Sequence, residues 1–98
     1  MEIVKNIEGS NCVIALEGRL DTTTAPQLEA ELKSSLNGIS DLVFDFSKLE
    51  YISSAGLRVL LSAQKVMNQQ GQMKITNVAP EILEVFEITG FTDILTLA

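Results

Sequence analysis

The hexapeptide Ile52-Ser53-Ser54-Ala55-Gly56-Leu57 lies where a strand-like apolar run gives way to the apolar spacing of a helix. The apolar run is Leu42–Phe46, and the helical spacing continues over Ala55–Gln70. Two hydroxyl groups therefore stand at the predicted start of a helix, where unpaired backbone N–H groups and the helix dipole favour an anion. Ser53 or Ser54 could cap the helix, or one of them could carry a phosphate group. The hexapeptide alone leaves both readings open.

The same analysis of spacing and turn residues predicts the elements on either side of the hexapeptide. Strands are expected at 2–7, 12–16, 41–46 and 72–78, helices at 24–36, 55–70 and 79–89, and a short strand or brief helix at 94–97. The order is β-β-α-β-α-β-α-(β), in which strands joined through a helix run parallel. We therefore predict a single α/β domain over residues 1–98, with a mixed sheet of four to five strands and helices mainly on one face.

Three local features are predicted in more detail. Thr24 and Gln27 have the spacing of a capping box at the start of the first helix. Residues 17–21 are expected to leave the second strand, and residues 47–50 to form a polar connection in which Leu49 points inward. The residues expected to face the core are Ala25, Leu28, Leu32, Ser35 and Leu36 in the first helix, Leu57, Leu60, Leu61, Val66 and Met67 in the second, Met73, Ile75 and Asn77 after it, and Ile82, Leu83, Val85, Phe86 and Ile88 in the third.

Composition excludes several classes of function. Seven basic and thirteen acidic residues give a net charge of −6, which disfavours binding to nucleic acid or to an anionic membrane surface. The chain shows no signal peptide and no apolar stretch of the ~20 residues needed to span a bilayer, so no membrane insertion and a cytoplasmic location are expected. The single cysteine, Cys12, lies in an apolar run and is expected to be buried and inert.

Residues for catalysis are nearly absent. The chain has no histidine to activate Ser54, and the serine lacks a nucleophile-elbow context. Asp41 and Asp45 share one face of a strand with Val43, which is more typical of surface solvation than of a catalytic pair. Metal-ligand clusters and phosphate-binding glycine loops are also missing, so we expect no enzyme activity, no metal and no cofactor. What remains is a recognition surface where residues 19–23 and the two serines follow neighbouring strands.

Three stretches, 17–21, 42–60 and 78–90, together resemble the bacterial anti-sigma-factor antagonists, whose fold is the STAS domain, and the resemblance covers essentially the whole chain. It implies that the protein binds an anti-sigma factor that is also a serine kinase, and so frees a sigma factor. The kinase would phosphorylate one serine and abolish binding, and a PP2C-type phosphatase would restore it. The family motif is commonly Asp-Ser-[Ser/Thr]-Gly, with the first serine modified.

Aligned on Gly56, this motif assigns the modified serine to Ser54 and puts Ser53 in the place of the aspartate, so that a second hydroxyl becomes an alternate phosphorylation site. Similar domains also occur in lipid-transport and sensory complexes, so a non-phosphorylated subunit of a membrane-associated complex is the alternative function. Asp21 matches an acidic residue of the family's loop after the second strand. The predicted partner-binding surface comprises Asp21, Thr22, Thr23, Ser53, Ser54, Ala55, Gly56 and Arg58.

Overall fold

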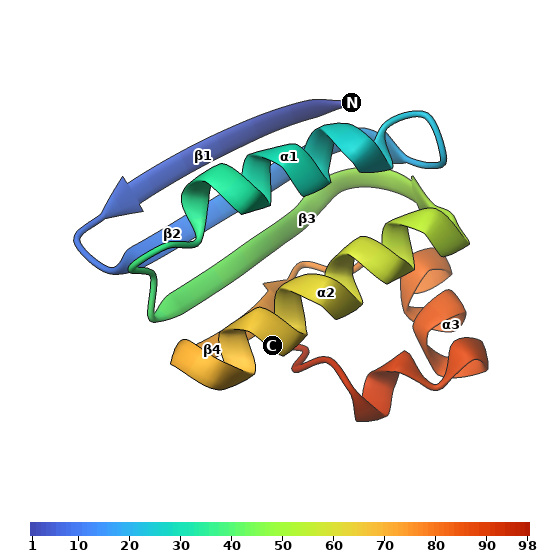
Figure 1. The fold of residues 1–98 in the computed structure, drawn as a ribbon. Coiled ribbons are helices and arrows are strands. Elements are labelled where there is room, and N and C mark those ends of the chain that lie inside the picture. The colour runs from blue at the N-terminus through green and yellow to red at the C-terminus, as the bar shows by residue number, and fades with distance from the viewer.

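The chain folds into four strands, three α-helices and one short 3-10 helix (Figure 1). The computed structural model describes residues 1–98. The elements are β1 (Glu2–Glu8), β2 (Asn11–Leu20), α1 (Ala25–Ser35), β3 (Asp41–Ile52), α2 (Ser54–Gln70), β4 (Gln72–Thr76), α3 (Pro80–Thr89) and η1 (Phe91–Asp93). The sheet order is β1-β2-β3-β4, with β1 antiparallel to β2 and the other neighbours parallel. The predicted α/β order and mixed sheet are confirmed.

The core lies between one face of the sheet and the helices. On β3, Phe44 and Phe46 are fully buried, and the ring of Phe46 lies 6.4 Å from that of Phe86 on α3. Full burial of a side chain of this size contributes about 1.5–3 kcal/mol. The stripe predicted for the first helix, from Ala25 to Leu36, is buried as expected. Cys12 is also buried, and this burial raises the pKa of its thiol, as expected of an unreactive cysteine.

Two strands are longer than the sequence predicted. Residues 17–20 stay in β2, and residues 47–50 are part of β3 rather than a connection. The two segments pair with each other, with register shifts between Ala15 and Glu17 and between Gly18 and Arg19. Backbone pairing does not require apolar side chains, and the shifts let polar residues face outward while Leu49 stays buried as predicted.

Some predicted core positions are exposed. On α2, Val66 is 42% exposed because it borders a cavity between α1 and α2, and Val59 is buried although it was not predicted to be. On α3, Ile82 and Phe86 are buried, whereas Ile88 is 78% exposed. Ile88 follows Phe86 by two residues, or about 200° around the helix, and therefore points away from the core.

The remaining differences lie around β4 and at the C-terminus. Asn77 is exposed and has a positive φ of 59°, because β4 ends at Thr76. The segment 94–97 is neither a full strand nor a helix, since it follows η1 and makes only an isolated parallel bridge between Leu97 and Ile75.

The end of α2 yields a test of this packing. A Cβ added to Gly71 would lie 1.8 Å from the carbonyl oxygen of Ser40, which also accepts a hydrogen bond from the Gln72 amide. Gly71→Ala is therefore expected to lower the free energy of unfolding by roughly 1–3 kcal/mol in urea denaturation, since backbone must move. The control is Gly9→Asn, at a turn where an added Cβ meets nothing within 4 Å and asparagine tolerates the φ of +62°. Equal stability of the two variants would contradict the close approach at Gly71.

Candidate functional site

The carboxyl ends of β2 and β3 meet at one edge of the sheet. There the backbone N–H of Ser53 donates to the carbonyl oxygen of Leu20 over 2.9 Å. Because Asp21 follows Leu20 directly, the loop before α1 and the first turn of α2 are held beside each other (Figure 1). The two segments predicted to form one recognition surface are therefore neighbours in space.

The two serines have different positions. Ser53 is the N-cap of α2, with extended φ and ψ of −100° and 175°, and its Oγ accepts from the Gly56 N–H at 3.4 Å. Ser54 is the first residue of the helix, is exposed, and its hydroxyl makes no hydrogen bond. The capping role left open by the sequence thus belongs to Ser53, and Ser54 presents a free hydroxyl at the positive end of the helix dipole.

Asp21 organises the loop before α1. Its Oδ1 accepts from the backbone N–H groups of Thr23 and Thr24 at 3.0 and 3.1 Å. The bond from the Thr24 amide, followed by those from the Thr24 hydroxyl and the Thr23 amide and by the charge of Arg19, holds the pKa of the Asp21 carboxyl below its ordinary value. The carboxylate therefore resists protonation in acid better than an ordinary Asp, and its loop adjoins the start of α2 through the Ser53–Leu20 backbone bond.

The predicted capping box of the first helix is wrong. Thr24 is the N-cap residue of α1, but its side chain makes no capping bond, and its hydroxyl instead donates to the Arg19 carbonyl oxygen at 2.8 Å. Gln27 turns toward the N-terminus, where its Nε2 donates to the Met1 carbonyl oxygen at 3.4 Å. The Asp21 carboxylate organises the hydrogen bonds here instead, because its Oδ1 accepts from the N–H groups of both Thr23 and Thr24.

Gly56 and Arg58 fill different roles in the first turns of α2. A Cβ on Gly56 would lie 2.7 Å from Leu20 Cγ and 2.9 Å from Ile52 Cγ1, so the helix approaches the strand ends as closely as a glycine permits. Gly56 is buried and positions the backbone, whereas Arg58 is exposed and makes no ion pair. Thr22, Ala55 and Arg58 line one shallow cavity, so the loop and the helix start form a continuous surface.

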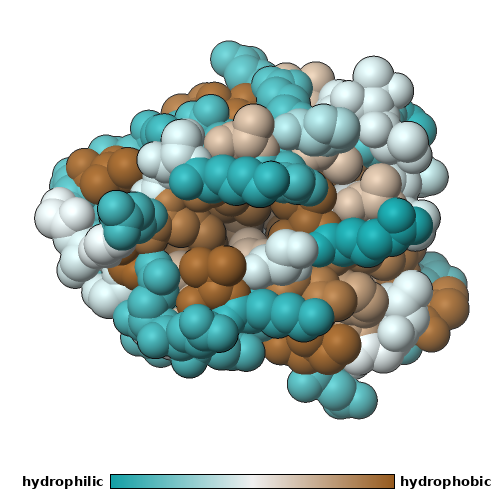
Figure 2. All heavy atoms as spheres, in the orientation of Figure 1, coloured by the Kyte–Doolittle hydropathy of each residue, from teal (hydrophilic) through white to brown (hydrophobic).

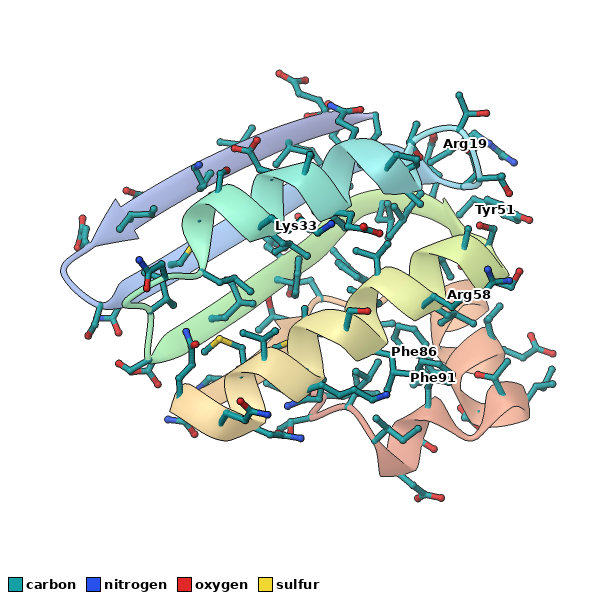
Figure 3. All side chains as sticks on the ribbon, in the orientation of Figure 1. Arg19, Lys33, Tyr51, Arg58, Phe86 and Phe91 are labelled. Carbon is teal, nitrogen blue, oxygen red and sulfur yellow. The ribbon has the colours of Figure 1, made fainter.

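One contact at this edge was not predicted. The Arg19 guanidinium lies 4.2 Å from the centroid of the Tyr51 ring, and its Nε lies 3.8 Å from Asp21 Oδ2 (Figure 3). Tyr51 is 41% exposed, and an exposed aromatic ring beside an arginine is typical of protein-binding surfaces. The register pairs Arg19 with Tyr51 across β2 and β3, but only after a bulge, so counting along the sequence does not find the pair.

Asp45 has a structural role. Its Oδ1 accepts from the Ser47 backbone N–H and from Asn77 Nδ2, both at 3.0 Å, and these bonds, that from Asn77 first, lower the pKa of the carboxyl. The carboxylate thereby joins β3 to the loop after β4. No group of three or more Cys, Asp or Glu side chains is arranged to hold a metal ion, and no helix is long and apolar enough to cross a membrane.

Comparison with known proteins finds one family. Residues 2–98 match the STAS domain. The chain is 42% identical over 88 residues to BtrV of Bordetella bronchiseptica, which is named as a candidate anti-sigma factor antagonist, covering 88% of this chain and 76% of that protein.

Two solved structures share the fold. An anti-sigma factor antagonist from Mycobacterium paratuberculosis superposes with a TM-score of 0.88 at 22% identity, covering 98% of this chain and 83% of the other. The Bacillus cell fate determinant SpoIIAA in its phosphorylated form superposes with a TM-score of 0.77 at 20% identity, covering 99% and 91%.

The two serines should differ in their effect on stability. Ser53→Ala removes the N-cap acceptor and is expected to lower the free energy of unfolding by about 0.5–2 kcal/mol. Ser53→Asp should preserve stability, because a carboxylate accepts the same N–H and favours the helix dipole. Ser54→Ala removes no hydrogen bond and is expected to change stability by less than about 0.5 kcal/mol. Urea denaturation measures all three, and a larger loss at Ser54 than at Ser53 would contradict this division of roles.

Stability should also depend on pH through Asp21 and Asp45. Both carboxyls have a lower pKa in the folded chain than the ordinary value of about 3.9 for Asp, so the unfolded chain binds more protons in acid. Their contribution is therefore complete above that value and is lost as the pH falls through the folded pKa values. Thermal unfolding of Asp21→Asn and Asp45→Asn should show a weaker loss of stability in acid. Asp93→Asn, at a carboxylate without a hydrogen bond, is the control and should follow the unsubstituted chain.

Proposed function

This chain belongs to the STAS domain family, and from that premise we propose that it is an anti-sigma factor antagonist controlled by phosphorylation. It binds an anti-sigma factor that is also a serine kinase, and thereby frees a sigma factor. The kinase phosphorylates Ser54 and ends the interaction, and a PP2C-type phosphatase restores it. Support for the partner comes from the names of BtrV and of the Mycobacterium protein, which describe anti-sigma factor antagonists.

The observation that carries the proposal is the exposed Ser54 hydroxyl without a hydrogen bond at the start of α2. A kinase can reach this hydroxyl without opening the fold, and a phosphate there adds about −1.5 to −2 charges. The helix N-terminus tolerates this charge, so the fold persists. Asp21 lies in the adjoining loop, and the combined negative charge alters the surface that a partner meets.

Ser54 is proposed over Ser53 because the Ser53 hydroxyl already accepts the Gly56 N–H. Ser53 occupies the place of the family's aspartate and can perform the capping part of that residue's role. A phosphate on Ser53 would have to replace this cap. One neighbour of the fold, SpoIIAA, has been solved in a phosphorylated form, which supports covalent regulation on this scaffold.

The proposed setting is the cytoplasm, where the kinase has ATP, and the chain acts by binding rather than by catalysis. Two observations support the second point. The sequence has no histidine, and the Ser54 hydroxyl has no hydrogen-bonded base that would activate it as a nucleophile. The residues of the binding surface are Asp21, Thr22, Thr23, Ser53, Ser54, Ala55, Gly56 and Arg58, with Arg19 and Tyr51 now added.

A second function is favoured by the uncovered face of the sheet. Val4 and Val13, 54% and 41% exposed, point away from the helices on neighbouring strands. An apolar sheet face can dock another protein, which suits a non-phosphorylated subunit of a membrane-associated transport or sensory complex. Purification of the chain from its host distinguishes the two functions. A phosphorylation switch should co-purify with a kinase, whereas a subunit of a transport complex should co-purify with transport components.

The switch is tested with a purified anti-sigma factor of the serine-kinase class from the host of this chain. Incubation with ATP should place one phosphate on Ser54, located by mass spectrometry, and Ser54→Ala should abolish it. In titrations without ATP, Ser54→Ala should bind the kinase as the unsubstituted chain does, whereas Ser54→Asp should bind it more weakly. An active kinase that leaves residues 53 and 54 unmodified would refute the phosphorylation switch.

A further inference from the structure

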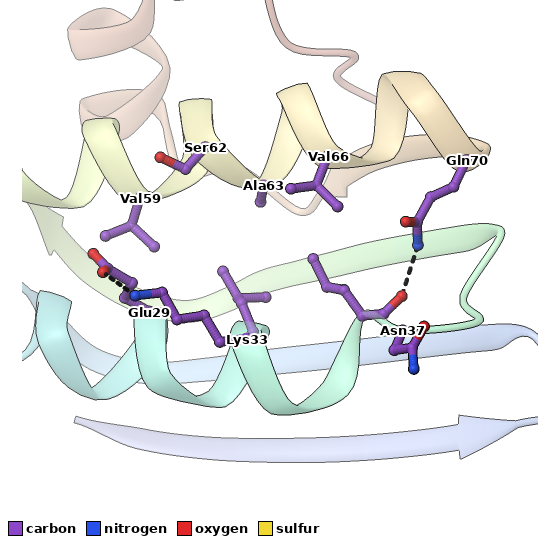
Figure 4. Close-up of a pocket in the computed structure, with 10 residues that line it drawn as sticks. Glu29, Lys33, Asn37, Val59, Ser62, Ala63, Val66 and Gln70 are labelled. Atoms are coloured by element: carbon purple, nitrogen blue, oxygen red, sulfur yellow. Dashed lines mark hydrogen bonds and ion pairs between the residues drawn. The ribbon is translucent and has the colours of Figure 1, made fainter.

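A trough runs between α1 and α2 on the helical side of the molecule (Figure 4). Its volume is about 380 Å³, and no part of the chain covers it. Hydrophobic side chains gather between hydrophilic ones on this face (Figure 2). The apolar side chains that line it are Leu32, Leu36, Val59, Ala63 and Val66.

The ends and rim of the trough are polar. At one end Gln70 Nε2 donates to the carbonyl oxygens of Leu36 and Ile39, both at 2.6 Å. Along α1, Lys33 Nζ pairs with Glu29 Oε1 at 3.1 Å. An apolar floor with a polar rim is the usual composition of a protein-binding groove.

The trough is continuous with the surface around Ser54. A second cavity, lined by Thr22, Ala55 and Arg58, shares Glu29, Val59 and Ser62 with the first. The two cavities therefore adjoin, and together their linings follow α1 from Thr22 in the loop before it to Asn37 after it. The 11 residues of α1 span roughly 16 Å, which is the length of three turns of a second helix.

We propose that this trough receives an amphipathic helix of the anti-sigma factor, with the apolar face of that helix on the floor and one of its carboxylates on Arg58. The inference rests on the proposed function and names a second contact of the same partner. The charges around the trough favour such a helix. The chain as a whole has a net charge of −6, but Glu29 is paired with Lys33, so Arg58 is the charged side chain of the two cavities that has no ion-pair partner (Figure 3). An unpaired guanidinium attracts a carboxylate of the partner helix.

Arg58 also links the trough to the switch. It follows Ser54 by four residues, so the two side chains leave the same face of α2 about 5–6 Å apart. A phosphate on Ser54 attracts the guanidinium and withdraws it from the partner's carboxylate. Phosphorylation thus weakens the trough contact at the end nearest the switch, and the apolar floor is unchanged.

The experiment compares two valines of equal exposure on opposite faces of the molecule. Val66, in the apolar lining of the trough, is 42% exposed, and Val13, on the uncovered sheet face, is 41% exposed. Val66→Glu should weaken binding to the purified anti-sigma factor by about tenfold in calorimetric titration, because it places a charge against an apolar surface. Val13→Glu should change the dissociation constant by less than about twofold.

Three further variants test the charge and guard against misfolding. Arg58→Glu should weaken binding and Arg58→Lys should largely retain it. Ser62→Glu, at an exposed position in the trough, repeats the Val66 test if Val66→Glu lowers stability in urea. Equal dissociation constants for the trough variants and Val13→Glu would overturn the inference.

The same titrations separate this inference from the proposed function. If Ser54→Asp weakens binding and the trough variants do not, the switch stands and the trough contact is refuted. If the trough variants weaken binding and Ser54→Asp does not, the contact stands without the switch. No complex with the unsubstituted chain would overturn both. Binding of a fluorescent fatty acid that Val66→Glu abolishes, with partner affinity unchanged, would assign the trough to a small apolar ligand instead.

Discussion

The seating of α2 on the ends of β2 and β3 is the constraint on which the rest of the structure depends. The Ser53 N–H bonds the Leu20 carbonyl oxygen, and Gly56 approaches the Leu20 side chain so closely that one more carbon would collide with it. These contacts set where α2 starts, and they bring the Asp21 loop beside it. The direction of α2 in turn determines the width of the trough that it forms with α1. The proposed partner surface and the core packing therefore depend on the same contacts between α2 and Leu20.

The element order was predictable because each helix or strand shows a clear apolar spacing or ends at clear turn residues. The predictions failed where tertiary pairing overrode local pattern. Ser47, Lys48 and Glu50 are polar, yet this segment pairs with β2 as a strand, since the bulges adjust the register and the hydrogen bonds of the sheet involve only backbone. Ile88 continues an apolar pattern, yet α3 needs only Ile82 and Phe86 to cover the core. Neither the strand pairing of residues 47–50 nor the exposure of Ile88 can be inferred from the neighbouring residues in the sequence.

The sequence predicted that the loop after β2 and the start of α2 would be neighbours, but it did not distinguish the positions of the two serines. Both serines are good N-cap residues, so the sequence cannot assign the cap without the backbone angles of Ser53. Asp21 was chosen as a charge facing a partner, and the structure adds that its carboxylate also shapes the loop. Tyr51 was missed because its pairing with Arg19 depends on a bulge, which has no reliable sequence signal.

Under the proposed switch, having Ser53 in place of the family's aspartate would matter more for a phosphorylated chain than for the unmodified one. In the unmodified chain, a hydroxyl and a carboxylate both accept the Gly56 N–H, and their capping strengths are similar. If position 53 were aspartate, a phosphate on Ser54 would stand directly next to a full negative charge. With serine there, the phosphate has Asp21 as its acidic neighbour and the donors of α2 as compensation. A neutral cap would therefore permit the added charge of the proposed phosphate at lower electrostatic cost than an aspartate at the same position.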